Sequence, residues 1–153
     1  MDDLGKLGMV HWHIGSMAKA QKCFEQGLRA AREAGYRLGE AANLGNLAAV
    51  HWHSHRLDKA QACYKRMLDI SRQIGYYHGV SAALTGLGVI HRRKGEYAKA
   101  LAYHGEALHQ DRKAGNRQGE VADLTNLGNL PEGLPGRKRD ILRLPRPITG
   151  RPW

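Results

Sequence analysis

The stretch Leu84–Leu108, LTGLGVIHRRKGEYAKALAYHGEAL, decides the fold of this 153-residue chain. Apolar residues recur at helical spacing on both sides of Lys94-Gly95, which predicts two helices broken at that dipeptide. Gly95 ends the first helix, since glycine readily takes the left-handed conformation that follows a helix C-terminus. The rest of the chain consists of imperfect copies of this segment.

The copies follow one another at a period of forty residues, and the same residue types align at this offset. The matching sets are Leu4, Leu44, Leu84 and Leu124; Leu7, Leu47, Leu87 and Leu127; Gly8, Ala48, Gly88 and Gly128; His11, His51 and His91; Ala20, Ala60 and Ala100. A fixed period between about twenty and fifty residues indicates a repeat array, in which each unit buries its apolar face against its neighbours. We expect an array over 1–129, with units at 4–43, 44–83 and 84–123 and a partial fourth unit at 124–129.

Within each copy the small residues allow two helices to approach closely. The second helix of the first copy presents Ala20, Phe24, Gly27 and Leu28 on one stripe. Small residues at positions 8 and 20 should let the helices approach, and the ring at position 24 should fill the next gap. The first helices should be short, each beginning about four residues after the glycine that closes the preceding copy. His55 stands where other copies have glycine and should cost that turn some stability.

These positions resemble the tetratricopeptide pattern. The residues that carry the resemblance are Leu87-Gly88, His91 in place of tyrosine, Ala100, and Phe24, Tyr64 or His104 at the aromatic position, with leucine in place of the first tryptophan. With six extra residues per unit, the array is similar to those of kinesin light chains, spindle-orienting G-protein-signalling modulators and many bacterial signalling regulators. The resemblance implies an all-α, right-handed α-solenoid of stacked antiparallel helix pairs. It also implies a non-enzymatic scaffold for protein–protein interaction, within a signalling or transcriptional regulator.

In arrays of this kind the first helices line a concave groove, and the resemblance assigns groove positions to this sequence. They are Met9, Trp12, His13, Gly45, Ala49, Trp52, His53, Thr85, Val89, Arg92, Arg93, Thr125 and Asn129. We expect a peptide or partner helix to lie there, anchored by Trp12 and Trp52. Arg92 and Arg93 would recognise acidic groups of that partner through their forked donors. In the alternative interpretation, the two tryptophan rings only cover neighbouring helices.

The C-terminal segment, residues 130–153, is rich in proline, glycine and arginine and has no period, so we expect it to be disordered. The chain carries a net charge of +10, which permits acidic partners, including nucleic acid. Arg137, Lys138 and Arg139 would then form an anion-binding arm, and a nucleic-acid- or phosphate-binding protein is the alternative function. The plainer interpretation is a solvated tail. Basic residues elsewhere are dispersed, which disfavours nucleic acid as the main partner.

The nine histidines do not indicate a metal site. His11 and His13 point to opposite sides of a helix. His11, His51 and His91 recur one repeat apart, too far for one zinc ion with bonds of about 2.0–2.1 Å. We interpret them as packing residues that replace tyrosine.

Other classes of function lack a signal in the sequence. We find no nucleophile elbow and no glycine-rich phosphate loop after a strand, and so expect neither catalysis nor a cofactor. Cys23 and Cys63 occupy equivalent positions and should be reduced, as in a cytoplasmic protein. No apolar run approaches the roughly twenty residues of a membrane span.

Neither end of the array shows a polar capping helix in the sequence, so both ends should expose apolar surface. Self-association through these ends is therefore possible. A fragment of a longer array, with no activity of its own, is the third alternative.

Overall fold

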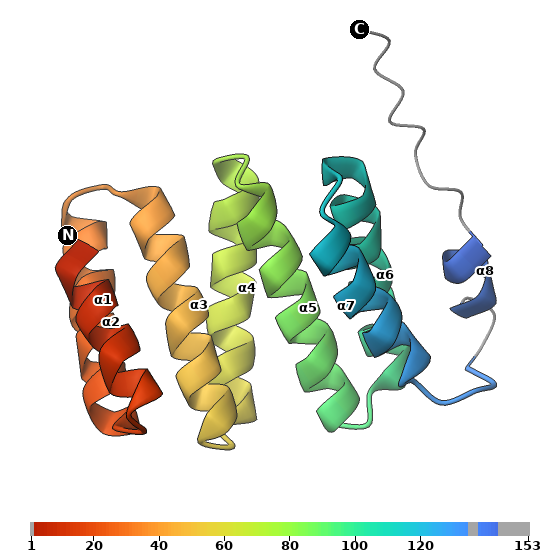
Figure 1. The fold of residues 1–153 in the computed structure, drawn as a ribbon, viewed down its shortest axis with the longest axis horizontal. Helices are drawn as coiled ribbons and strands as arrows, with labels where there is room; N and C mark the ends of the chain where they lie inside the picture. The colour runs from red at the N-terminus through yellow and green to blue at the C-terminus, as the bar shows by residue number, and fades with distance from the viewer. Residues whose placement is uncertain (1, 135–137, 144–153) are drawn as a thin grey trace, which may run out of the picture. The chain divides into compact units, whose positions relative to one another are not determined.

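The computed structural model describes residues 2–134 and 138–143, which form eight α-helices and no strand (Figure 1). The helices are α1 Asp2–His13, α2 Met17–Glu33, α3 Arg37–His53, α4 Leu57–Gln73, α5 Tyr77–Arg93, α6 Tyr97–Ala114, α7 Arg117–Gly128 and α8 Lys138–Arg143. The predicted all-α fold of stacked antiparallel helix pairs is confirmed.

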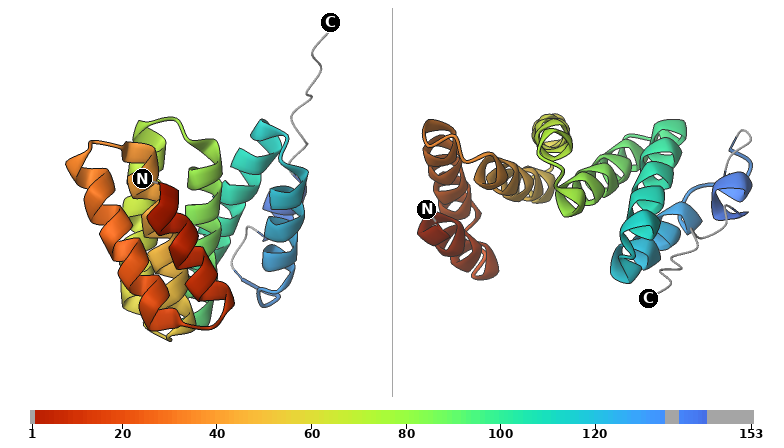
Figure 2. Two further views of the ribbon diagram at one scale, coloured as in Figure 1. Left: turned by 60° about the vertical axis from the view of Figure 1, so that its left-hand side comes forward. Right: turned by 90° about the horizontal axis from the view of Figure 1, so that it is seen from above.

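The helices belong to two compact units, residues 1–83 and 84–153, whose boundary lies within α5. In the first unit α1 pairs with α2 and α3 with α4, and α3 also packs on α2 (Figure 2). In the second unit α6 packs on α7, and residues of α5 from Leu84 onward contact both of these helices.

Two of the helix pairs, α1–α2 and α5–α6, are brought together where a glycine of one helix faces a ring of the other. A Cβ atom added at Gly8 would overlap the ring of Phe24, and one added at Gly88 would overlap the ring of His104. Both rings are almost completely buried, at 1% and 0% exposed. The predicted close approach of the paired helices is therefore confirmed, because a larger residue at either glycine would force the helices apart.

The turns between helices repeat one geometry. In five turns, the residue just before the N-cap of the next helix is a glycine with left-handed backbone conformation and φ between 65° and 78°. These glycines are Gly15, Gly35, Gly75, Gly95 and Gly115. His55 occupies the same place in the turn between α3 and α4, with φ 56°. The prediction that His55 is forced into a conformation that side chains resist is confirmed.

The first helices are longer than expected. The helices α3 and α5 have 17 residues each and begin two residues after the left-handed glycine, at Arg37 and Tyr77. The expectation of short first helices is wrong, because one left-handed residue is enough to reverse the chain. The second glycine of each closing pair lies inside the helix: at Gly39 the missing side chain leaves room for the ring of Tyr36, which folds back over the first turn.

The C-terminal segment also differs from the prediction of disorder over 130–153. Leu130 is 3% exposed within a cluster of α6 and α7 residues, and Leu134 and Ile141 pack against that cluster. Ile141 belongs to the short helix α8 and approaches Gly105 of α6. Apolar burial against α6 and α7 thus orders the described part of this segment, while residues 135–137 and 144–153 lie outside the described residues.

At the other end, α1 presents an apolar face to solvent, as expected. Leu7 is 46% exposed and Val10 is 54% exposed. The residues forty positions later, Leu47 and Val50, are 4% and 0% exposed, since α3 packs against α2 as well as α4. Equivalent apolar positions therefore contribute very differently to stability in the two copies.

This difference in burial predicts that the same change from leucine to alanine has unequal effects at residues 7 and 47. Leu47→Ala should lower the free energy of unfolding by about 2–5 kcal/mol, because it leaves a cavity in a packed interior. Leu7→Ala should cost less than half as much, since nearly half of that side chain is already in water. Denaturant unfolding followed by circular dichroism measures both values. Equal losses would show that α1 is covered in solution, and sedimentation velocity would then reveal whether a second copy covers it.

The turn at His55 gives a stabilising prediction. His55→Gly should raise the free energy of unfolding by about 0.5–1 kcal/mol, because relief of the left-handed strain exceeds the added entropy of the unfolded chain. The neighbouring change Ser54→Gly is the control and should be destabilising, since Ser54 has an ordinary φ of −88°. A loss of stability in His55→Gly would mean that the imidazole makes a compensating contact.

Candidate functional site

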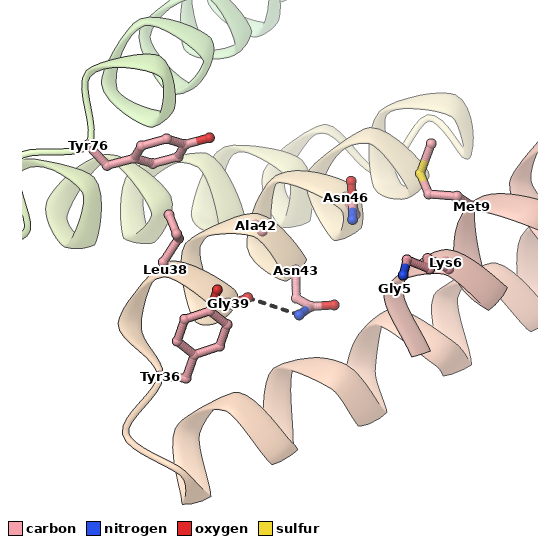
Figure 3. Close-up of a pocket in the computed structure, with 10 residues that line it drawn as sticks. All are labelled: Gly5, Lys6, Met9, Tyr36, Leu38, Gly39, Ala42, Asn43, Asn46 and Tyr76. Atoms are coloured by element: carbon pink, nitrogen blue, oxygen red, sulfur yellow. Dashed lines mark hydrogen bonds between the residues drawn. The ribbon is translucent and has the colours of Figure 1, made fainter. Parts of the chain in front are cut away.

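A pocket of about 720 Å³ opens between the first helices of the first unit (Figure 3). It is lined by Gly5, Lys6, Met9, Tyr36, Leu38, Gly39, Ala42, Asn43, Asn46 and Tyr76. Residues of α1 form one wall and residues of α3 the opposite wall. The two tyrosines come from the turns that precede α3 and α5.

The pocket combines an apolar lining with a few polar groups. Asn43 donates a hydrogen bond from Nδ2 to the carbonyl oxygen of Gly39 at 2.9 Å, which fixes the orientation of the amide (Figure 3). Its Oδ1 atom is buried beside Gly27 without a hydrogen-bond partner. Asn46, the two phenol groups and the Lys6 ammonium supply further donors and acceptors. This lining suits a ligand that makes both apolar contacts and hydrogen bonds.

Part of the predicted groove lies along the same two helices. Met9 lines the pocket, and Trp12 lies about one turn further along α1. The Trp12 ring meets the ring of His53 from α3 edge-on, with centroids 4.7 Å apart. Trp12, Ala49 and Trp52 are half-buried, whereas His13 and His53 are exposed. The structure thus brings Met9, Trp12 and His53 to one face, and sequence reasoning missed the tyrosines and Asn43 beside them.

The remaining predicted groove residues belong to the second unit. Val89 and Arg92 are half-buried on α5, while Arg93 at its end is exposed. Arg92 has its Nε atom buried without a hydrogen-bond partner. Asn129 follows the last residue of α7 and is exposed.

Of the three predicted anion-binding residues, only Lys138 has a described side chain. Its ammonium donates hydrogen bonds to the carbonyl oxygens of Gly128 and Leu130 and pairs with Glu132 at 2.9 Å. Lys138 therefore satisfies one carbonyl group at the end of α7 and one just beyond it. Arg137 and the side chain of Arg139 lie outside the described residues.

The predicted packing role of the histidines agrees with their burial. His51 is 8% exposed, and burial, followed by the charge of Arg56, lowers its pKa. His91 is 4% exposed, stacks on the Tyr103 ring at 5.2 Å and forms a short hydrogen bond to the carboxylate of Glu96. That bond lowers the pKa of Glu96. Among the residues that the structure describes, no three metal-ligating side chains cluster.

The second unit contains a buried polar cluster that sequence reasoning did not identify. His104 and Asp123 are both 0% exposed, with His104 Nδ1 and Asp123 Oδ1 3.9 Å apart. The hydroxyl of Thr85 donates to Asp123 Oδ1 at 2.9 Å, and the carboxyl group of Asp111 lies close enough to affect the pKa of Asp123. The available signal was the repeat itself, because the equivalent residues in the first copy are Phe24 and Asn43.

Burial shifts the two titratable groups in opposite senses. It lowers the pKa of His104 to about 4, with the charge of Arg92 as a smaller cause. It raises the pKa of Asp123 to about 7, and the nearby Asp111 adds to that rise. At neutral pH the imidazole is therefore uncharged, and Asp123 is near its titration midpoint. The cluster is closed to solvent, so its chemistry affects stability rather than binding.

A family model described as tetratricopeptide repeat matches residues 4–73 and 40–113. No curated protein matches the chain. Over the part of the chain that the structure describes, no helix combines the length and hydropathy needed to cross a lipid bilayer.

The buried cluster predicts opposite pH dependences for two substitutions. His104 binds its proton more weakly in the folded chain, so its contribution to stability is lost as pH falls from about 6.5 to about 4. Asp123 holds its proton more tightly in the folded chain, so its contribution is lost as pH rises from about 3.8 to about 7. The two effects oppose each other between about pH 4 and 6.5 in the wild type.

The substitutions His104→Phe and Asp123→Asn separate these effects. Phenylalanine and asparagine already stand at the equivalent positions of the first copy, as Phe24 and Asn43. Relative to wild type, His104→Phe should become less stable as pH rises from 4 to 7. Asp123→Asn should become less stable as pH falls from 6.5 to 4. Denaturant midpoints measured across this range test both slopes, and parallel curves for the two variants would contradict the assignment.

Proposed function

Because the chain belongs to the tetratricopeptide repeat family, we propose that it is a protein-binding scaffold whose ligand is a peptide segment held between α1 and α3. Domains of this family generally bind proteins and are typically non-catalytic. The observation that carries the proposal is the pocket between the first helices of two successive repeats. We further propose that the array serves a signalling or transcriptional regulator, a role supported by resemblance.

The lining residues suit a peptide because half of them are exposed to solvent and can be covered by a ligand. Met9 and Tyr36 are 39% and 45% exposed, although both are large and apolar in part. Asn46 carries both a donor and an acceptor, which is the combination needed to pair with a peptide group of an extended chain. Lys6 is an exposed residue, and its positive charge favours an acidic residue in the ligand.

The Trp12–His53 contact extends this surface along the helices. A half-buried tryptophan offers a large rigid area at little cost in conformational entropy, and tryptophan is enriched among residues that dominate binding energy. His13, Ala49 and Trp52 would border the same stretch. In the second unit Val89, Arg92, Arg93 and Asn129 would form a recognition surface of their own, with the arginines directed at acidic groups.

Selection from a random peptide display library, followed by affinity measurement on purified protein, tests this function. Selected peptides should bind Lys6→Gln and Asn46→Ala at least about tenfold more weakly than wild type, which corresponds to about 1.4 kcal/mol. Trp12→Ala should also weaken binding, because it removes the proposed anchor. The helical circular dichroism spectrum of each variant establishes that it is folded.

Lys19→Gln is the matched control, since Lys19 is an exposed lysine on α2 outside the pocket lining. It should bind the selected peptides as wild type does. Equal binding by wild type and all pocket variants would place the peptide site elsewhere. Failure to select any peptide against the folded wild type would contradict the scaffold proposal itself.

A further inference from the structure

A second polar surface in the first unit is organised around one buried carboxylate. Glu40 lies in the first turn of α3, and its side chain is 5% exposed. Its Oε1 accepts a hydrogen bond from Arg32 Nε at 3.1 Å and lies 3.5 Å from Arg66 Nη2. Its Oε2 accepts from Arg37 Nη1 at 2.8 Å. Three helices therefore each contribute one guanidinium to a single carboxylate.

The surface carries more positive charge than the carboxylate neutralises. The Arg32, Arg37 and Arg66 side chains are 40%, 45% and 58% exposed, so solvent and ligands can reach them. Among the described residues, these arginines form ion pairs with no carboxylate other than Glu40. One negative charge against three positive charges leaves a local surplus of two.

The fold does not require this surplus. The second unit repeats the smaller arrangement, with Arg112 and Arg117 paired to the buried Glu120. In the intervening copy Val80 replaces the glutamate and is 6% exposed, so a repeat also forms without the carboxylate. The position of Arg66 is occupied by Gln26 in the preceding copy and by Glu106 in the following one. Packing therefore does not select an arginine at residue 66.

We propose that Arg32, Arg37 and Arg66 form a binding site for a dianionic phosphate monoester. A phosphate monoester carries a charge of about −1.5 to −2 at pH 7, which matches the surplus of two. Guanidinium groups suit this ligand because their planar arrays of donors bind phosphate oxygens in a bidentate manner. None of the three arginines lines the pocket between α1 and α3, so the site is separate from the proposed peptide site.

The contacts with Glu40 would hold the arginines ready for such a ligand. Arg32 through Nε and Arg66 through Nη2 approach the same oxygen of Glu40, so this contact brings the two guanidinium groups near each other. Arg37 is also held by Gln73, which accepts from its Nη2 at 2.6 Å. Preorganised donors lose less side-chain entropy when they bind, and an anion would relieve the repulsion among the three guanidiniums.

Isothermal titration calorimetry of the full chain at low ionic strength tests the proposal with four probes. Phenyl phosphate is the small monoester, and a phosphoserine peptide presents the same group on a polypeptide. The unphosphorylated peptide and dimethyl phosphate, a monoanionic diester, are the controls. Both monoesters should bind saturably and more tightly than the controls. Binding of phenyl phosphate without the phosphopeptide would identify a small-molecule site, whereas stronger binding of the phosphopeptide would identify a phosphorylated partner.

Arg66→Gln should weaken monoester binding at least tenfold, because it removes one fork and one charge while leaving the Arg32–Glu40 and Arg37–Glu40 pairs in place. Arg66→Lys keeps the charge and should recover only part of the affinity. Lys65→Gln is the matched control, an equal charge change at the adjacent exposed position of α4. Equal losses in Lys65→Gln and Arg66→Gln, equal affinity for the monoester and the diester, or no saturable binding by wild type would each overturn the proposal.

Discussion

The fold depends on the close contact between a small residue of one helix and a ring of its partner helix. At Gly8 and at Gly88 a single added carbon atom would overlap the facing ring, so the distance between the paired helices is set at one point. The contact occurs with Phe24 in the first copy and with His104 in the third, and Tyr64 stands at the equivalent position of the second copy. Because the size of the ring matters more than its chemistry at this contact, the chain accommodates a buried imidazole there and keeps it uncharged through burial.

This constraint also explains where a binding surface can exist. A helix whose inner stripe is committed to packing has its other side chains available, and in α1 and α3 those side chains lie on both sides of the pocket. Tyr36 reaches the pocket rim only because Gly39 leaves room for its ring over the first turn of α3. The geometry of the turn and the lining of the candidate site therefore have the same cause.

The period, the helix pairs, the left-handed turns and the packing histidines could be predicted from sequence, because each follows from spacing or from backbone sterics alone. The start of α3 could not, since the pairs of glycines suggested a longer turn and one left-handed residue sufficed. The helix α8 was missed because proline-rich composition outweighed Ile141, whose burial requires a surface on α6 that sequence does not display. Asp123 was missed because a carboxylate on an amphipathic helix ordinarily faces water, whereas this one is enclosed by Thr85 and His104.

Repeats also separate the contribution of packing from that of function within one molecule. A position that keeps its residue type in every copy, such as the alanine at residues 20, 60 and 100, is explained by burial, since all three are 0% exposed. A position that varies freely is not constrained by the fold, and Arg66 is one of these. Yet its guanidinium lies beside two others around a buried carboxylate, where like charges repel. Packing does not require this arrangement, electrostatics opposes it, and Glu40 neutralises only one of the three charges; these facts together are the basis of the phosphate site that we propose.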